Sequence, residues 1–127
     1  MRLALDTNRY ADLARGHEDV LTLVQDADEV WLPLIVLAEL RAGFVRGQCS
    51  LENERVLRRF LGEAGVGVLV PDQATTHTYA ALYLQLRAQG TPIPTNDLWI
   101  AALVVQHGLV LMSQDRHFGR LGQIKVV

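Results

Sequence analysis

Four acidic residues, Asp6, Glu39, Asp97 and Asp115, stand where carboxylates could do chemistry. Each of them follows an apolar run, opens an expected helix or interrupts an apolar helix face. If their side chains converge, the four negative charges repel one another strongly unless a cation lies among them. Hard oxygen donors select Mg²⁺ or Mn²⁺ rather than Zn²⁺. The pattern therefore predicts a divalent-metal site built from these four carboxylates.

Glu39 is the most informative of the four, because it interrupts an apolar stretch. On a helix, its neighbours one turn away share small or apolar side chains: Ile35, Val36, Ala42 and Gly43. Burying a lone carboxylate is costly or forces it to become neutral, and a bound cation removes that cost. The ordinary alternative is a glutamate at the rim that pairs with an arginine such as Arg41 or Arg46.

The other three acids each have an ordinary structural explanation. Asp6 and Asp97 come at helix starts, where aspartate caps the helix or is favoured by its dipole. Asp115 follows an apolar run, as turn aspartates do, and Thr95 and Asn96 are equally suitable cap residues. The helix face that carries Asp97 is apolar one turn on, which favours a functional role for it. The joint pattern, rather than any single residue, indicates a metal site.

The elements that must position these residues follow from the hydropathy pattern. Short apolar or β-branched runs predict strands at 3–5, 29–32, 66–70, 109–112 and 124–127. Helices are expected at 7–14, 17–27, 34–45, 51–64, 71–88 and 94–107, with Ser50 as the N-cap of the fourth. Strands that alternate with helices predict one α/β domain over residues 1–127 with a mainly parallel sheet. Ligands of such sheets bind beyond the carboxyl ends of the strands, where Asp6 and Asp115 fall.

Length and composition agree with one globular domain, since the 127 residues are 50% hydrophobic and 20% charged. A net charge of −2 excludes a broadly basic nucleic-acid binder, although an enzyme that holds phosphate through metal and a few arginines stays open. The lone Cys49 forms no internal disulfide and suits a reducing compartment. No apolar run is long enough for a signal peptide or a membrane span, so we expect a cytoplasmic protein.

Other catalytic chemistries find little support in the residues. The four histidines are scattered and, with a single cysteine, form no zinc-binding spacing. Lys125 is the sole lysine, which leaves no glycine-rich phosphate loop with its lysine, and Ser50 and Ser113 lack a nucleophile-elbow context. His117, close to the fourth acid, is interpreted as a loop residue or a support for the site.

Four segments of the chain resemble the signature segments of PIN domains: Leu5–Asn8, Leu37–Leu40, Thr95–Ala102 and Ser113–Phe118. The chain resembles more closely the VapC-type toxins of bacterial and archaeal toxin–antitoxin pairs. Each segment alone is a weak signal, but the four follow in order and cover nearly the whole length. The sequence departs from the usual pattern in Ser113, where threonine is common, in Arg9-Tyr10 and in the bulky Trp99.

The resemblance implies a three-layer α/β/α sandwich with a mainly parallel sheet and a Mg²⁺- or Mn²⁺-dependent endoribonuclease. The four acids would form its metal site, with Thr7 or Asn8, Thr95, Asn96 and Ser113 in support. The resemblance also implies an RNA substrate, a homodimer and an antitoxin partner. The tail of that antitoxin would wrap the toxin and block the acidic pocket, often with an arginine.

The mechanism expected from this site is metal-assisted hydrolysis of phosphodiester bonds, with one or two ions that orient and activate a water. Asp6 and Asp97 are the expected direct ligands, Asp115 would bind directly or through water, and Glu39 would bind a second ion or position the water. Basic residues near the acids in sequence would guide the RNA backbone, although each could be an ordinary surface arginine: Arg9, Arg41, Arg46 and Arg116.

Two alternatives come from other classes of protein. A binding module without turnover could use the acids as a docking pocket for a basic partner tail. A phosphatase or phosphotransfer domain would want a second acid two residues after the first, but that position is Asn8. The pattern of four acids favours the nuclease over both.

Overall fold

The chain alternates strands and helices from end to end in the computed structural model, which describes all 127 residues. The strands are β1 (Arg2–Leu5), β2 (Glu29–Pro33), β3 (Val66–Leu69) and β4 (Val110–Met112). The helices are α1 (Thr7–Ala14), α2 (Glu18–Asp26), α3 (Leu34–Arg46), α4 (Ser50–Leu61), α5 (Gln73–Gln89) and α6 (Thr95–His107), followed by the short 3₁₀ helix η1 (Arg116–Arg120).

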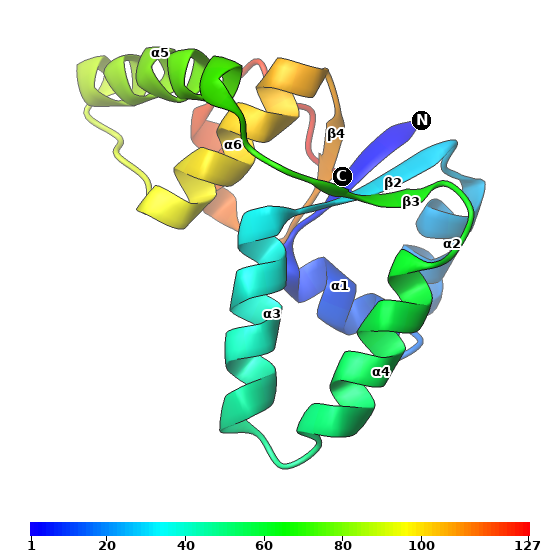
Figure 1. The fold of residues 1–127 in the computed structure, drawn as a ribbon. Helices are drawn as coiled ribbons and strands as arrows, with labels where there is room; N and C mark the ends of the chain where they lie inside the picture. The colour runs from blue at the N-terminus through cyan, green and yellow to red at the C-terminus, as the bar shows by residue number, and fades with distance from the viewer.

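The four strands form one parallel sheet in the order β3-β2-β1-β4. Figure 1 shows α5 and α6 packed together on one side of this sheet, whereas α1, α2 and α4 lie on the other side and α3 runs beside α4. The expected three-layer α/β/α sandwich with a parallel sheet is therefore confirmed. Because all strands point the same way, the residues that follow β1 and β4 meet at one edge of the sheet.

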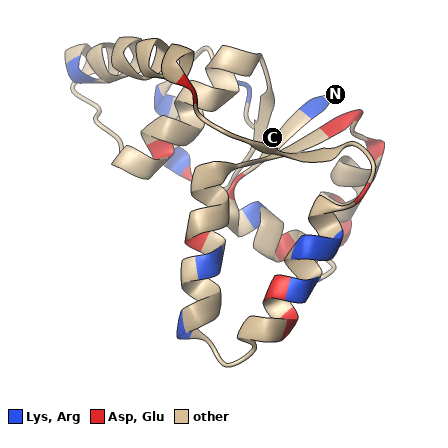
Figure 2. Ribbon diagram, viewed as in Figure 1, with Lys and Arg blue, Asp and Glu red and all other residues tan.

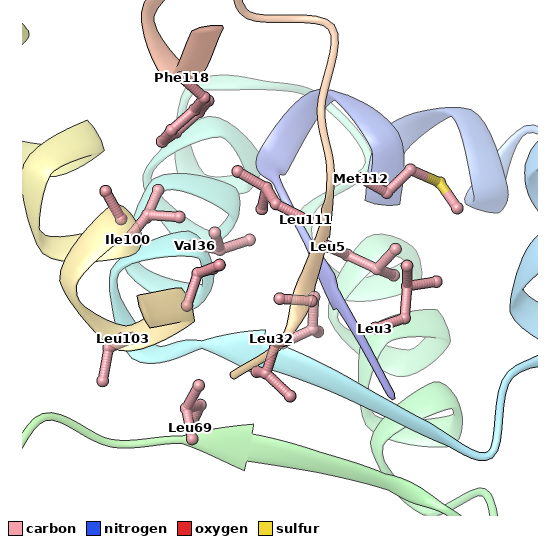
Figure 3. Packing of buried hydrophobic residues seen from close by; sticks show 14 of the residues in the cluster. Leu3, Leu5, Leu32, Val36, Leu69, Ile100, Leu103, Leu111, Met112 and Phe118 are labelled. Carbon is pink, nitrogen blue, oxygen red and sulfur yellow. The ribbon is translucent and has the colours of Figure 1, made fainter. Parts of the chain in front are cut away.

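The core lies between the two helical layers, and β1 and α6 contribute several of its fully buried residues (Figure 3). Leu3, Ala4 and Leu5 are all fully buried, as expected of a central strand that is covered on both faces. Helix α6 contributes an almost continuous buried run from Leu98 to Val104, with Trp99 half-buried. This packing holds the start of α6 against the carboxyl edge of the sheet.

The turns into these elements follow local chemistry. Asp72 begins α5 with a capping box in which its carboxylate accepts the Thr75 N–H at 3.0 Å. Gly108 ends α6 at a φ of 63°, a left-handed conformation that glycine adopts without a steric penalty, and the chain passes directly into β4. The predicted N-cap at Ser50 is wrong by one residue, because Cys49 takes the cap position and Ser50 is the first helical residue.

The end of the chain departs from the predicted strand at 124–127. Ile124 closes a turn by donating its N–H to the Leu121 carbonyl, which leaves only three residues to pair with β4. What forms is an isolated parallel bridge between Leu111 and Val126 rather than a strand. Helix η1, which precedes this turn, was not predicted. No helix of the molecule combines the length and the apolar character that crossing a membrane requires.

Candidate metal centre

Asp6 occupies the first position after β1, where the pairing with β4 places it beside Ser113. Leu5 pairs with Met112, and the Asp6 N–H continues this ladder by donating to the Met112 carbonyl at 3.0 Å. The Ser113 hydroxyl then donates to Asp6 Oδ2 at 2.6 Å, and the Thr7 N–H donates to Oδ1 at 2.8 Å. Asp6 is thus both the N-cap of α1 and a carboxylate that is only 5% exposed at the sheet edge.

Burial raises the pKa of the Asp6 carboxyl above its usual value. The hydrogen bonds from Ser113 and Thr7 oppose this rise, whereas the neighbouring charges of Glu39 and Asp115 add to it. The raised pKa means that the protein surroundings under-compensate the negative charge of Asp6.

Asp97 lies in the first turn of α6 and faces the same cluster. Its Oδ2 atom is 2.8 Å from Nδ1 of His117. Burial raises the pKa of the Asp97 carboxyl, the His117 hydrogen bond partly offsets this, and the charges of Asp115 and Asp6 raise it further. The carboxylates that repel one another come from three places in the chain: the end of β1, the start of α6 and the segment after β4.

Asp115 caps η1, because its Oδ1 accepts the His117 N–H at 2.9 Å. Its own N–H donates at 3.0 Å to the Ser113 hydroxyl, the same hydroxyl that donates to Asp6. Ser113 therefore ties two of the predicted acids together. Phe118, fully buried one residue after His117, fixes η1 against the core.

Glu39 is half-buried on α3, and its Oε1 accepts a hydrogen bond of 2.8 Å from the Thr7 hydroxyl. Its alternative role as an ion-pair partner of Arg41 or Arg46 is not observed. Arg41 instead makes two hydrogen bonds of 3.0 Å to Glu54 on α4. Glu39 thus has no cationic partner in the protein, and it lies near enough to Asp6 to raise the pKa of that residue.

The predicted supporting residues divide into two groups. Thr7 and Ser113 hold acids directly, and Asn8 accepts a hydrogen bond from the Gln114 N–H at 3.4 Å in the loop that carries Asp115. Thr95 and Asn96 are exposed and donate no side-chain hydrogen bond to the cluster. Neither of them caps α6, whose N-cap position is taken by Pro94.

The predicted arginines also differ in how free they are. Arg9 pairs with Asp12 at 3.2 Å, and its Nε atom is buried without a partner, so it is part of the α1 surface rather than of an open rim. Arg41 is engaged by its pair on α4. Arg46 and Arg116 are exposed, form no ion pair and remain available to an anionic ligand.

His117 contacts two of the acids, as expected of a residue that supports the site. It lies in η1 rather than in a loop, and its Nδ1 is 2.8 Å from Asp97 and 2.9 Å from Asp115. These three residues offer donor atoms that all lie within 4.8 Å of one another. The signal that could have found it is the Asp-x-His-Phe order, in which the buried Phe118 fixes the orientation of the two residues before it.

The donor set fits a divalent cation. Carboxylates of Asp6, Asp97 and Asp115 gather at one sheet edge, and the first two carry raised pKa values because their charges repel and are buried. A bound cation relieves that repulsion, and oxygen donors are the ligands that Mg²⁺ and Mn²⁺ prefer.

The comparison with known families agrees with this geometry. The sequence matches the PIN domain family over residues 3–124. This chain belongs to the PIN domain family. Among curated relatives, this PIN domain is 30% identical over 94 residues to ribonuclease VapC4 of Mycobacterium tuberculosis, an alignment that covers 74% of this chain and 72% of the relative. It is 28% identical over 117 residues to ribonuclease VapC5 of the same organism, covering 92% of this chain and 85% of the relative.

Solved structures agree over the whole PIN domain. VapBC-1 from nontypeable Haemophilus influenzae matches with a TM-score of 0.86 at 26% identity, covering 100% of this chain and 97% of that chain. VapBC2 from Rickettsia felis, in a structure with a DNA fragment from their promoter, matches with a TM-score of 0.85 at 25% identity, covering 100% and 98%.

Proposed function

We propose that this protein is a Mg²⁺- or Mn²⁺-dependent endoribonuclease and the toxin of a toxin–antitoxin pair. The observation that carries the proposal is the convergence of Asp6, Asp97 and Asp115, with Glu39 beside them, at the carboxyl edge of a PIN-domain sheet. Names of relatives support the activity, because three of the matching curated proteins are ribonucleases, and a fourth is a plasmid stability protein.

In this proposal, a bound divalent ion supplies Lewis-acid chemistry: it activates a water and neutralises charge on the scissile phosphate. The protein contributes the position. Asp6 and Asp97 would hold the ion directly, since both carboxylates point into the cluster with under-compensated charge. Asp115 would complete the set, and Ser113 would fix Asp6 and Asp115 relative to each other through its single hydroxyl.

Glu39 would act from the α3 side of the site. Its carboxylate is held by the Thr7 hydroxyl at 2.8 Å and has no cationic partner, so it is free to orient a water or to bind a second ion. Figure 2 shows that the red segment of α3 is followed by blue segments further along the same helix. Of the arginines near the site in sequence, Arg46 and Arg116 would guide the RNA backbone, because their guanidinium groups are not engaged within the protein.

An antitoxin and a second copy of the toxin would be the partners. The matching structures of VapBC from Haemophilus influenzae and Rickettsia felis are toxin–antitoxin assemblies, the latter with promoter DNA, which supports an antitoxin partner for this chain. A basic side chain of that antitoxin, in the place of the metal ion, would satisfy the same under-compensated carboxylates and block the site.

The test is RNA cleavage by wild type and by Asp97→Asn in Mg²⁺ or Mn²⁺, with purity checked for contaminating nuclease. We expect Asp97→Asn to lose at least about 100-fold in rate, on the scale of removing one electrostatic group from an active site. Asp19→Asn, an exposed acid on α2, is the matched control and should cleave as wild type. Unchanged cleavage by Asp97→Asn would refute the proposal. Absence of millimolar-range metal binding in calorimetry would favour the docking module instead.

A further inference from the structure

We propose that His117 supplies an imidazole nitrogen to the metal centre, so that the site takes Mn²⁺ in preference to Mg²⁺. The proposal rests on the metal-dependent activity proposed above and refines it. The four acids account only for oxygen donors. His117 adds the one nitrogen donor of the cluster, and it contacts two of the acids rather than lying beyond them.

The spacing of the donor atoms carries the argument. Two ligands bound at right angles, each about 2.1 Å from one ion, lie about 3.0 Å apart. The Nδ1 atom of His117 is 2.8 Å from Asp97 Oδ2 and 2.9 Å from Asp115 Oδ1. The ring nitrogen is therefore already separated from each carboxylate oxygen like neighbouring ligands of a single ion, and all three donor atoms lie within 4.8 Å of one another.

The backbone around His117 keeps the ring in this position. Asp115 accepts the His117 N–H at 2.9 Å, which places the carboxylate and the ring on the same side of η1. Phe118 is fully buried next to it, and η1 packs against α6, which carries Asp97. These contacts fix the backbone of η1, and the Nδ1 contacts with Asp97 and Asp115 orient the ring.

The two ring nitrogens have different surroundings. Nδ1 faces two carboxylates, whereas Nε2 has no hydrogen-bond partner in the protein, and the side chain is 34% exposed. A neutral ring that carries its proton on Nε2 can donate it to water and present the Nδ1 lone pair to an ion. In this arrangement, His117 is a ligand; with the proton on Nδ1, it only donates hydrogen bonds to the two acids.

A nitrogen ligand changes which ion the site prefers. Mg²⁺ binds oxygen donors almost exclusively, whereas imidazole suits transition metals, and Mn²⁺ accepts both kinds of donor. A site with carboxylates alone offers no nitrogen donor to distinguish the two ions. A site with one imidazole favours Mn²⁺.

Pulsed electron paramagnetic resonance tests the bond itself. One equivalent of Mn²⁺ added to the intact chain should show modulation from a directly bound ¹⁴N nucleus, and His117→Gln should abolish it. Since the first measurement is made on wild type, it does not depend on how a variant folds.

Calorimetric titration with Mn²⁺ and with Mg²⁺ then separates a ligand from a hydrogen-bond donor. In His117→Gln, we expect Mn²⁺ affinity to fall by about 10-fold to 100-fold, the scale of disturbing a metal ligand set, with a much smaller loss for Mg²⁺. The glutamine amide can still donate a hydrogen bond to Asp97, so a purely hydrogen-bonding histidine predicts little change for either ion. His77→Gln, at an exposed position on α5, is the matched control and should bind both ions as wild type.

The outcomes distinguish this inference from the proposed function. The nitrogen ligand is refuted if Mn²⁺ binds without nitrogen modulation, or if His117→Gln loses equal affinity for both ions. RNA cleavage by the same preparation would still support the proposed nuclease activity. Failure of wild type to bind either ion overturns both proposals.

Discussion

Removal of the Ser113 hydroxyl is a small chemical change that should disturb the site strongly, because this one group makes hydrogen bonds to both Asp6 and Asp115. Ser113→Ala removes the donor to Asp6 Oδ2 at 2.6 Å and the acceptor of the Asp115 N–H at 3.0 Å. Hydrogen bonds to charged groups contribute roughly 1.5–3 kcal/mol, and neutral ones about 1 kcal/mol. Because Ser113 is buried, water does not fully replace either bond. We expect the free energy of unfolding to fall by about 2–3 kcal/mol, on the scale of these two bonds.

The matched control is Ser113→Thr, which keeps the hydroxyl at the same buried position. Urea unfolding of the metal-free proteins should show a clear loss for alanine and a much smaller one for threonine. Calorimetric titration should show weaker Mn²⁺ binding by about tenfold or more in the alanine variant, because Asp6 and Asp115 lose their common support. Equal stability losses in both variants, or an alanine variant as stable as wild type, would refute the assignment of these two hydrogen bonds.

Two further predictions concern pH and packing. Burial raises the pKa values of Asp6 and Asp97, so their protonation stabilises the metal-free fold: this contribution is complete below the usual carboxyl value of 3.8 and is lost as pH rises through the raised values. The free energy of unfolding, measured in a chelator from pH 4 upward, should therefore decline less steeply in Asp97→Asn than in wild type. Parallel curves would contradict the raised pKa of Asp97. Gly67→Ala should destabilise the protein by about 1–3 kcal/mol, because its new Cβ would lie 2.8 Å from the Trp31 ring. Gly43→Ala, where nothing lies within 4 Å, should be neutral or stabilising in the same thermal melts, and an equal loss at both sites would point away from the ring contact.

The position of the site at the sheet edge could be predicted from the sequence, because the strands are recognisable as apolar runs that acids follow. Asp6 and Asp115 were placed beyond strand ends by pattern alone, and the pairing of Leu5 with Met112 brings the segments after them together. The same reasoning could not foresee that one residue between them, Ser113, would bond to both. That contact depends on the register between β1 and β4, which most of the chain separates in sequence.

Glu39 illustrates what the pattern of a helix face can and cannot predict about the partners of a side chain. Its apolar neighbours correctly argued against an ordinary surface pair, since Arg41 turns to Glu54 on the next helix instead. The hydroxyl that holds Glu39 comes from Thr7, 32 positions earlier in the chain. Helical periodicity contains no information about such a partner, because it is supplied by tertiary packing.

The end of the chain was the least predictable part of the fold. Helix η1 is only five residues long and has no apolar periodicity, so its existence depends on the burial of Phe118 and on the Asp115 cap. Apolar composition at 124–127 suggested a strand, but the turn that Ile124 closes shortens the pairing to a bridge. The contacts of His117 with Asp97 and Asp115 could not be predicted for the same reason, since its place depends on η1.

The hydrogen bond from Ser113 to Asp6 also has a consequence for when the protein becomes active. Its two residues are 107 positions apart, so protein synthesis delivers one partner near the beginning and the other near the end. Before β4 pairs with β1, Asp6 lacks its nearest donor and the acids of α6 and η1 have no sheet edge to meet at. A nascent chain therefore has no assembled centre until nearly all of the chain has been synthesised.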